Sequence, residues 1–266
     1  MTNSLVETLA HRLDDAARTH IPIPPISESE GITNVDTAYA IQRGWTELRL
    51  ARGENVVGRK IGLTSAAIQK QLGVDQPDYG NLWSTTQYTA HNGQVEIPTS
   101  DFVQPRVEGE VAFLIGKSVR ASADEPITPE QILAATEACA LGVEIVASRI
   151  ADWKIKLVDT IADNASYGGF TLGPWDPTLR EHDLGALAMT ITHNGTLAAE
   201  GVGAAALGHP AKSVAWLANK LSEVGGSLEP GDIVISGGIT KMLPVQAGDQ
   251  FVFTLTSQPS LVVSFT

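Results

Sequence analysis

The sequence predicts an α+β protein, with a smaller helical part at the N-terminus and a β-rich body after it. In the first 51 residues, apolar side chains recur at the three- and four-residue spacing of amphipathic helices. After residue 82, short apolar runs follow turn signals such as Asn-Gly and Pro-Gly, which is typical of strands joined by tight turns. We therefore expect residues 1–75 to be mainly helical and residues 76–266 to form a β-rich body, which is long enough for one core.

Two helices are predicted in the N-terminal part. The first covers residues 4–18, where Leu5, Leu9 and Leu13 recur every four residues, and a proline-rich stretch follows it. The second covers residues 35–51, which again place their apolar side chains on one face.

The segment that links these helices to the body combines a strand with turn signals. A strand is expected at residues 55–61, and Thr64 or Ser65 would cap a short helix that Gly73 ends. Residues 73–82 are rich in Gly, Asp, Asn and Pro, so we expect them to form a loop.

In the body, local signals place turns, helices and strands. The dipeptides Asn92-Gly93 and Asn194-Gly195 are typical of hairpin turns. A helix is expected from Pro129, where Thr128 and Gln131 form a capping box, and another from about Pro210 to Gly225. Strands are expected at residues 104–115, 139–146, 230–236, 247–253 and 260–265.

Composition and charge exclude several classes of protein. The net charge is −12 and no basic cluster is present, which argues against a general nucleic-acid binder. No run of about 18 apolar residues exists, so no membrane span is expected. The N-terminus lacks the pattern of a secretory signal, and the single cysteine suits a cytoplasmic protein. That residue, Cys139, lies in an apolar stretch, and we expect it in the core.

The motif Glu108-Gly109-Glu110 lies in the predicted strand 104–115. Side chains two residues apart on a strand project to the same face, so the two carboxylates lie close together and repel each other. Open solvent or a shared cation would relieve this repulsion, and Mg²⁺ and Mn²⁺ prefer carboxylate oxygens. Taken alone, the motif is compatible with a solvated strand face as well as with a metal site.

Glu144 is a third acidic residue of interest, because it lies within an apolar strand. Glutamate is rarely buried unless it is paired or bound to a metal. With Glu108 and Glu110 it would complete a set of three carboxylates for Mg²⁺ or Mn²⁺. The alternative is an ion pair with Arg149 or Arg106.

Three further segments could serve a ligand. Lys60 lies among glycine and apolar residues, where burial would lower the pKa of its ammonium group, although it could also lie at the surface. The run 148–166 is either an amphipathic helix or, at 159–166, a loop that offers hydroxyls and amides. The glycine-rich turn 236–240 exposes backbone N–H groups that could hold an anion.

Six segments together resemble the fumarylacetoacetate hydrolase-like superfamily, in the branch of 2-hydroxypenta-2,4-dienoate hydratases and 4-oxalocrotonate decarboxylases. They keep their order along the chain and comprise residues 57–64, 72–80, 104–110, 143–153, 159–166 and 207–210. The resemblance implies a mixed β-roll-like body with a smaller N-terminal part, usually in a homo-oligomer.

The resemblance also implies roles for single residues. Glu108, Glu110 and Glu144 would bind Mg²⁺ or Mn²⁺. Lys60 and Asp78 would be catalytic. The residues expected to contact the substrate, a small 2-oxo or 2-hydroxy-dienoic acid, are Leu63, Ser166, Ser236 and Gly237.

The activity that the resemblance implies is hydration of 2-hydroxypenta-2,4-dienoate to 4-hydroxy-2-oxopentanoate, in the breakdown of aromatic compounds by meta-cleavage. Decarboxylation of 4-oxalocrotonate and another reaction of the family, such as C–C hydrolysis, are alternatives. A non-catalytic subunit that stabilises an enzyme partner is an alternative of a different class.

Overall fold

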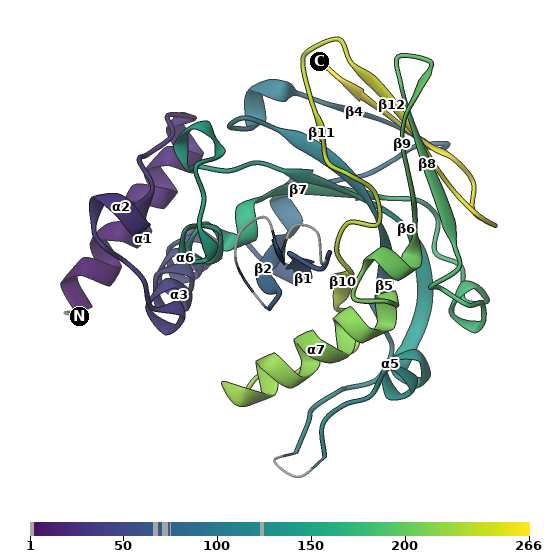
Figure 1. The fold of residues 1–266 in the computed structure, drawn as a ribbon, viewed down its shortest axis with the longest axis horizontal. Coiled ribbons are helices and arrows are strands. Elements are labelled where there is room, and N and C mark those ends of the chain that lie inside the picture. Colours follow the sequence, from purple (N-terminus) through teal and green to yellow (C-terminus); the bar gives the residue numbers. More distant parts are fainter. Residues whose placement is uncertain (1–2, 66–68, 71–73, 75, 123–124) are drawn as a thin grey trace.

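A computed structural model describes the chain except for residues 1–2, 66–68, 71–73, 75 and 123–124. The short helix expected between residues 64 and 73 therefore lies largely outside the described residues. Helices gather on one side of Figure 1 and the strands on the other, with α7 (Pro210–Glu223) and α5 (Pro129–Ala135) beside the strands. None of the described helices is long and apolar enough to cross a membrane.

The two helices predicted at residues 4–18 and 35–51 are present. Helices α1 (Asn3–Thr19) and α3 (Val35–Ala51) contact each other and bury the apolar side chains that define their faces, including Leu9, Leu13 and Trp45. The Asn34 side chain accepts a hydrogen bond from the Thr37 N–H and caps α3. The shorter helices α2 (Ile26–Ser29) and α6 (Leu157–Ala162) contact each other beside this pair.

Eight strands form the larger sheet, in the order β2-β1-β10-β5-β6-β7-β3, with β11 paired to β5. Its strands are β1 (Val56–Gly62), β2 (Asp78–Trp83), β3 (Gln87–Tyr88), β5 (Arg106–Ile115), β6 (Thr136–Val146), β7 (Tyr167–Leu172), β10 (Ile233–Ile235) and β11 (Leu243–Pro244). The sheet is mixed, because β1 and β10 are parallel whereas β5 and β6 are antiparallel.

The loop predicted at residues 73–82 is wrong from Asp78 onward, where strand β2 begins. All six residues of β2 are buried, because β2 pairs with β1 and packs against the turn Asn164–Ser166. A side chain at Gly80 would meet the Asn164 carbonyl oxygen at 2.3 Å, so this glycine allows close packing. The sheet also includes β1, so the β structure of the body begins at residue 56.

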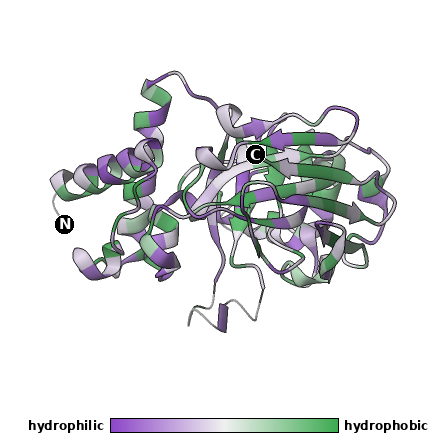
Figure 2. Cartoon of the chain, turned by 90° about the horizontal axis from the view of Figure 1, so that it is seen from above, coloured by the Kyte–Doolittle hydropathy of each residue, from purple (hydrophilic) through white to green (hydrophobic). Residues whose placement is uncertain are grey.

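Five strands form the second sheet, which packs against the outer face of the first. Its order is β4-β13-β12-β8-β9, and its strands are β4 (Gln94–Ile97), β8 (Ala188–His193), β9 (Thr196–Val202), β12 (Gln250–Leu255) and β13 (Leu261–Phe265). The odd-numbered residues of β5 point toward this sheet: a side chain at Gly109 would meet Met189 and Phe253. In Figure 2, apolar residues (green) alternate with more polar ones along the strand-rich side of the molecule.

The larger sheet curls so strongly that β2 contacts β7. Its inner face carries the even-numbered residues of β5, and Ala112, Ala140 and Phe170 contribute to a separate apolar cluster there. Glu108 and Glu110 precede Ala112 on the same face, so the acidic motif points into the curled sheet.

Local signals in the body are confirmed. The capping box of Thr128 and Gln131 begins α5, and the turns at Asn92-Gly93 and Asn194-Gly195 have positive φ at both residues. Cys139 is fully buried, as expected for a core residue.

Candidate metal centre and active site

Three glutamates meet on the inner face of the curled sheet. Glu108 on β5 lies directly opposite Glu144 on β6, and Glu110 follows two residues later on the same face. One carboxylate oxygen from each lies within 4.8 Å of the others. Glu110 and Glu144 are fully buried, so the alternative of a solvated strand face is wrong.

Burial raises the pKa of all three glutamates, and the charges of nearby acids add to the rise. Burial and then the charge of Glu144 raise the pKa of Glu108 to about 8. Burial also raises the pKa of Glu110 well above its ordinary range, and both neighbouring carboxylates add to the effect. The pKa of Glu144 rises for the same first reason, but Lys60 opposes the rise.

The donor set fits a hard divalent cation. Among the described residues, Glu110 Oε1 and Glu144 Oε2 are buried oxygens without a hydrogen-bond partner, which is costly unless a cation occupies the space between them. The other oxygen of Glu110 accepts a hydrogen bond of 2.6 Å from the Gly237 N–H, which orients the carboxylate. The cluster contains carboxylates without His or Cys, a set that suits Mg²⁺, Mn²⁺ or Ca²⁺.

Lys60 on β1 is buried, with 2% of its surface exposed, so the surface alternative is wrong. Its Nζ lies 3.0 Å from Glu144 Oε1 and donates a 2.9 Å hydrogen bond to the Ala165 carbonyl. Burial alone would lower the pKa of Lys60, as expected from the sequence. The surrounding acids, Glu144 and Asp78 foremost, outweigh burial and raise this pKa above its ordinary value.

Glu144 is therefore paired with Lys60, and the two arginines proposed as its partners lie elsewhere. Arg149 forms an ion pair with Asp163. Arg106 places its guanidinium over the Trp153 ring, 4.2 Å from the centroid.

Asp78 lies at the start of β2, next to Lys60 through the pairing of β1 with β2. A side chain at Gly62 would meet Asp78 Oδ1 at 2.2 Å and Lys60 Nζ at 3.3 Å, so the glycine leaves room for both groups. Asp78 Oδ2 accepts a 3.0 Å hydrogen bond from Thr160, whose hydroxyl lies 3.4 Å from Ser166 Oγ. Burial raises the pKa of Asp78, and the charge of Lys60 opposes the rise.

The other predicted substrate contacts follow the ends of β1 and β10. These strands are parallel, so Leu63 and Ser236 emerge at the same edge of the sheet. Leu63 has a φ of 58°, which costs a non-glycine residue ~1–3 kcal/mol and is often found at functional sites. The Ser236 hydroxyl is buried and has no hydrogen-bond partner among the described residues. At Gly237, φ is 99° and a side chain would collide with Thr64.

The run 148–166 combines both expected alternatives. Its middle forms the short helix α6, and residues Asn164–Ser166 form a turn with φ near 53° at each residue. Thr160, the Ala165 carbonyl and the pair of Arg149 with Asp163 were not among the site residues predicted from the sequence. A sequence signal for this pair was Asp163, a charged residue directly after an apolar run. The structure shows that Asp163 is fully buried.

Curling of the sheet explains how these residues meet. Lys60 and Glu144 lie on β1 and β6, which are separated by β10 and β5. In a flat sheet, three interstrand spacings of about 4.8 Å would separate them by roughly 14 Å. Because the sheet closes on itself, both side chains point inward and meet at 3.0 Å.

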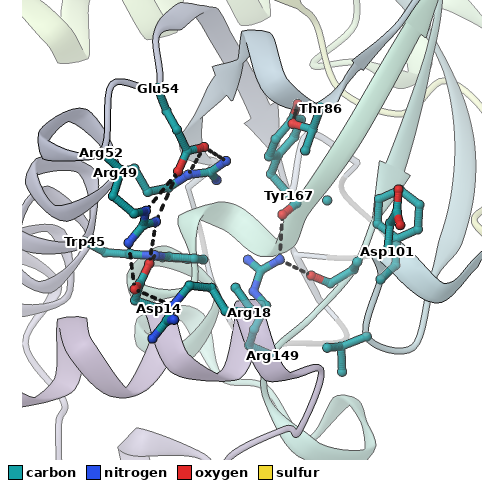
Figure 3. Close-up of a pocket in the computed structure, with 15 residues that line it drawn as sticks. Asp14, Arg18, Trp45, Arg49, Arg52, Glu54, Thr86, Asp101, Arg149 and Tyr167 are labelled. Atoms are coloured by element: carbon teal, nitrogen blue, oxygen red, sulfur yellow. Dashed lines mark hydrogen bonds and ion pairs between the residues drawn. The ribbon is translucent and has the colours of Figure 1, made fainter. Parts of the chain in front are cut away.

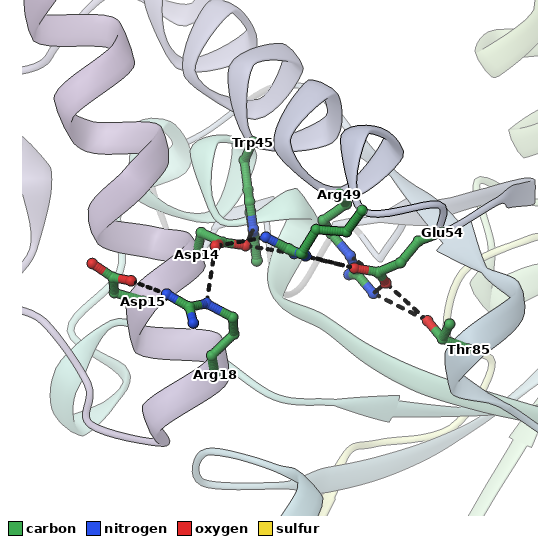
Figure 4. Close-up of polar contacts among 8 residues, drawn as sticks. Asp14, Asp15, Arg18, Trp45, Arg49, Glu54 and Thr85 are labelled. Carbon is green, nitrogen blue, oxygen red and sulfur yellow. Dashed lines mark hydrogen bonds and ion pairs between the residues drawn. The ribbon is translucent and has the colours of Figure 1, made fainter.

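A cavity of about 160 Å³ lies apart from the glutamates, between α1, α3 and β7 (Figure 3). Arg18, Arg49, Arg52 and Arg149 line it together with several acids. Its charges are largely paired: Arg52 contacts Asp14 and Glu54, and Arg49 contacts Glu54 (Figure 4). This network ties α1 to α3 and to the start of the body.

A family model for the fumarylacetoacetate (FAA) hydrolase C-terminal region matches residues 56–265. The chain belongs to this family. It is 40% identical over 261 residues to 2-hydroxyhexa-2,4-dienoate hydratase of Comamonas testosteroni, which covers 98% of this chain and 97% of the relative. It is also 40% identical over 261 residues to 2-keto-4-pentenoate hydratase of Paraburkholderia phymatum, with the same coverage.

Among solved structures, 4-oxalocrotonate decarboxylase from Pseudomonas putida G7, complexed with magnesium and adipate, superposes with a TM-score of 0.94 and 30% identity. The match covers 100% of this chain and 99% of the other. A second structure of that decarboxylase is complexed with calcium and acetate. The family and the fold class expected from the sequence are thus confirmed, whereas the roles of the individual site residues stay predictions.

Proposed function

We propose that this protein is a divalent-metal-dependent hydratase that acts on 2-hydroxypenta-2,4-dienoate in the meta-cleavage breakdown of aromatic compounds. Water and the dienoate would give 4-hydroxy-2-oxopentanoate. The observation that carries the proposal is the cluster of half-buried Glu108 with buried Glu110 and Glu144 beside Lys60, in a chain 40% identical to hydratases over nearly its full length. We place the enzyme in the cytoplasm.

The three glutamates would hold Mg²⁺ or Mn²⁺, and the bound cation would supply Lewis-acid stabilisation of negative charge on the substrate 2-oxygen. A related decarboxylase structure holds calcium, so a titration of this chain with Mg²⁺, Mn²⁺ and Ca²⁺ would identify the ion that binds most tightly. Lys60 adds a fixed positive charge beside Glu144, in an interior where electrostatic stabilisation is strong.

The reaction consists of two proton movements and one addition. The 2-hydroxyl loses its proton and C5 gains one, which gives a conjugated 2-oxo-3-enoate. The oxygen of water then bonds to C4 and gives up one of its protons, while C3 gains one proton. Lys60 would stabilise the negative charge near the 2-oxygen, and Asp78, with its raised pKa, would hold or transfer a proton.

Four residues are proposed to bind and orient the substrate. Ser236 offers a buried hydroxyl that has no hydrogen-bond partner among the described residues, and it follows the strand beside Lys60. Gly237 already donates its N–H to Glu110. Leu63 follows Lys60 by three residues, and the Ser166 hydroxyl lies 3.4 Å from that of Thr160. Both residues have a left-handed backbone, which supports a functional role for them.

The second candidate function is decarboxylation of 4-oxalocrotonate, favoured by the TM-score of 0.94 to such an enzyme. A diacid needs a partner for its second carboxylate. Within the described residues, the ion pairs of the glutamate cluster involve one cation, Lys60. Together with the higher identity to hydratases, this supports hydration.

The deciding experiment gives the Mg²⁺- or Mn²⁺-loaded protein two substrates and identifies the products by NMR. We expect rapid conversion of 2-hydroxypenta-2,4-dienoate to 4-hydroxy-2-oxopentanoate, and little CO₂ from 2-oxohex-3-enedioate. Fast CO₂ release with an inert dienoate would reverse the ranking. Metal binding without turnover of either substrate would favour a non-catalytic subunit. A homo-oligomer is also proposed, and sedimentation velocity tests it.

A further inference from the structure

Arg149 is a buried arginine whose hydrogen bonds converge on one short turn. Its Nε lies 2.5 Å from Asp163 Oδ1, and Nη2 donates to the Asp163 carbonyl. Its Nη1 donates to the carbonyls of Ala147 and Tyr167, the latter at 2.6 Å. Asp163 and Tyr167 are the residues immediately before and after the turn Asn164–Ser166, so one guanidinium joins both ends of that turn.

The turn carries groups that contact the predicted catalytic residues. The Ala165 carbonyl accepts the hydrogen bond from Lys60. The Asn164 side chain accepts from the Asn81 N–H at 2.7 Å and donates to the Asn81 carbonyl at 2.9 Å, which holds β2 beside the turn. A shift of the turn would therefore move the acceptor for Lys60 and the strand that carries Asp78.

The turn has an unfavourable backbone that other contacts must hold in place. Its three residues have φ of 53° each, and none is glycine. Such conformations persist only where the surroundings impose them. The Arg149 guanidinium donates four hydrogen bonds that help to impose this conformation. The Ser148 hydroxyl and the Arg149 backbone N–H donate two more to the Asp163 carboxylate, each 3.0 Å long.

We infer that Arg149 and Asp163 are positioning residues, which hold the Asn164–Ser166 turn so that the Ala165 carbonyl orients Lys60. The inference rests on the proposed function, because the turnover measured below is hydration of 2-hydroxypenta-2,4-dienoate. A planar guanidinium with five donors is needed, because a lysine ammonium has three donors and cannot span the carboxylate and three carbonyls at once. The guanidinium also lies over the Trp45 ring, 5.0 Å from the centroid, so it connects α3 to the turn.

The first test compares Arg149→Lys with Arg52→Lys. Both arginines line the cavity of Figure 3, but the hydrogen bonds and ion pairs of the Arg52 side chain go to Asp14 and Glu54, away from the turn. We expect Arg149→Lys to keep its fold and Mn²⁺ affinity, to change KM little and to lose about 10–100-fold in kcat, as small misplacements of catalytic groups do. Arg52→Lys should turn over like the wild type. Wild-type kcat in Arg149→Lys would overturn the inference.

The second test asks whether a free guanidinium ion can replace the missing Arg149 side chain. Arg149→Ala should lose kcat, and added guanidinium should restore part of it, whereas sodium chloride at the same ionic strength should not. Rescue supports positioning. Loss of folded structure in Arg149→Lys, or a parallel loss of Mn²⁺ binding and kcat without rescue in Arg149→Ala, would show a general structural role and overturn the inference.

A third readout separates this inference from the proposed function. With ¹³C-labelled lysine, the Lys60 Cε resonance should shift in Arg149→Lys and stay in place in Arg52→Lys, whether or not any substrate is turned over. An inactive wild type would refute the proposed function alone. An unchanged Lys60 resonance in Arg149→Lys would refute the positioning role alone.

Discussion

Lys60, Asp78 and the three glutamates form a group of ionisable side chains that share the interior of one curled sheet. Burial disfavours every carboxylate charge, and the pKa of each acid is raised, whereas the acids together raise the pKa of Lys60. A divalent cation between the glutamates would compete with protons for the same carboxylate oxygens. The consequences of changing one member of this group depend on whether it would bind the metal or neighbour it.

Lys60→Met removes the cation from this group while keeping a long apolar side chain. We expect kcat to fall by ~10²-fold or more, in the range for losing one acid–base or oxyanion-stabilising group. Affinity for Mn²⁺ should not fall, because the change removes a positive charge near the predicted ligands. Steady-state kinetics and a metal titration test this, with the exposed Lys154→Met as control. Unchanged kinetics would rule out a catalytic Lys60.

Glu110→Gln removes one carboxylate charge but retains an amide oxygen that can accept from the Gly237 N–H. We expect most metal binding and turnover to be lost. The metal-free variant should unfold at the same temperature as the wild type or higher, because repulsion from Glu108 and Glu144 is relieved. Calorimetry of metal binding and thermal unfolding measure both effects. Glu137→Gln, an exposed change on strand β6, is the matched control.

At the scale of single elements, alternation on β5 and β6 separates two environments. One face packs on the five-stranded sheet, and the opposite face carries the glutamates. Helix α7 depends on a local device: it begins at Pro210, and His209 Nδ1 accepts a hydrogen bond of 3.1 Å from the Ala211 N–H. A histidine accepts at this nitrogen only when it is unprotonated there.

The cap of α7 should therefore respond to pH. Burial lowers the pKa of His209 below its ordinary value of 6.5. Because the pKa of His209 is lower in the folded state than in the unfolded state, neutral His209 stabilises the fold at any pH above the unfolded-state pKa. This stabilisation is lost as the pH falls through the folded-state pKa. A helix cap usually contributes about 1 kcal/mol. We expect up to this much of the free energy of unfolding to be lost when the pH falls below 6.5.

His209→Asn tests this expectation, because asparagine is a good cap that does not titrate. Urea unfolding of both proteins at pH 7.5 and pH 5 should show a smaller loss of stability for His209→Asn. An equal loss in the two proteins would show that the cap does not depend on the charge of His209.

At the scale of the whole molecule, the curled eight-stranded sheet holds the group of acids on its inner face, and the five-stranded sheet packs on its other face. The predicted metal ligands come from two adjacent strands of a single sheet. A cation bound there would link these strands in the folded state, whereas the unfolded chain would not hold the three carboxylates together. Metal binding should therefore stabilise the whole fold by mass action.

Removal of the metal with EDTA should abolish turnover, and Mg²⁺ or Mn²⁺ should restore it. At a metal concentration about 100 times the Kd, the expected stabilisation is about 2.7 kcal/mol. At roughly 2–4 °C for each kcal/mol, the melting temperature should rise by about 5–10 °C. Differential scanning calorimetry measures the shift, and Glu110→Gln should show little of it. Full activity in metal-free protein would contradict the metal-site proposal.

Features that depend on neighbouring residues could be predicted from the sequence. Helix 35–51, the capping box at Thr128 and the Asn-Gly turns were predicted correctly, because each follows from side-chain spacing or from contacts within a few residues. The shared face of Glu108 and Glu110 follows in the same way from strand alternation. The family motifs added the mixed β-roll-like architecture of the body.

Features that depend on contacts between distant segments could be seen only in the folded structure. Residues 78–82 have the composition of a loop, but pairing with β1 makes them a strand. The pKa of Lys60 rises rather than falls, because curling of the sheet brings acids from β2, β5 and β6 around it. The connection of Arg149 to the turn beside Lys60 likewise depends on packing. Such contacts form between residues far apart in the chain, where local pattern carries no information on distance.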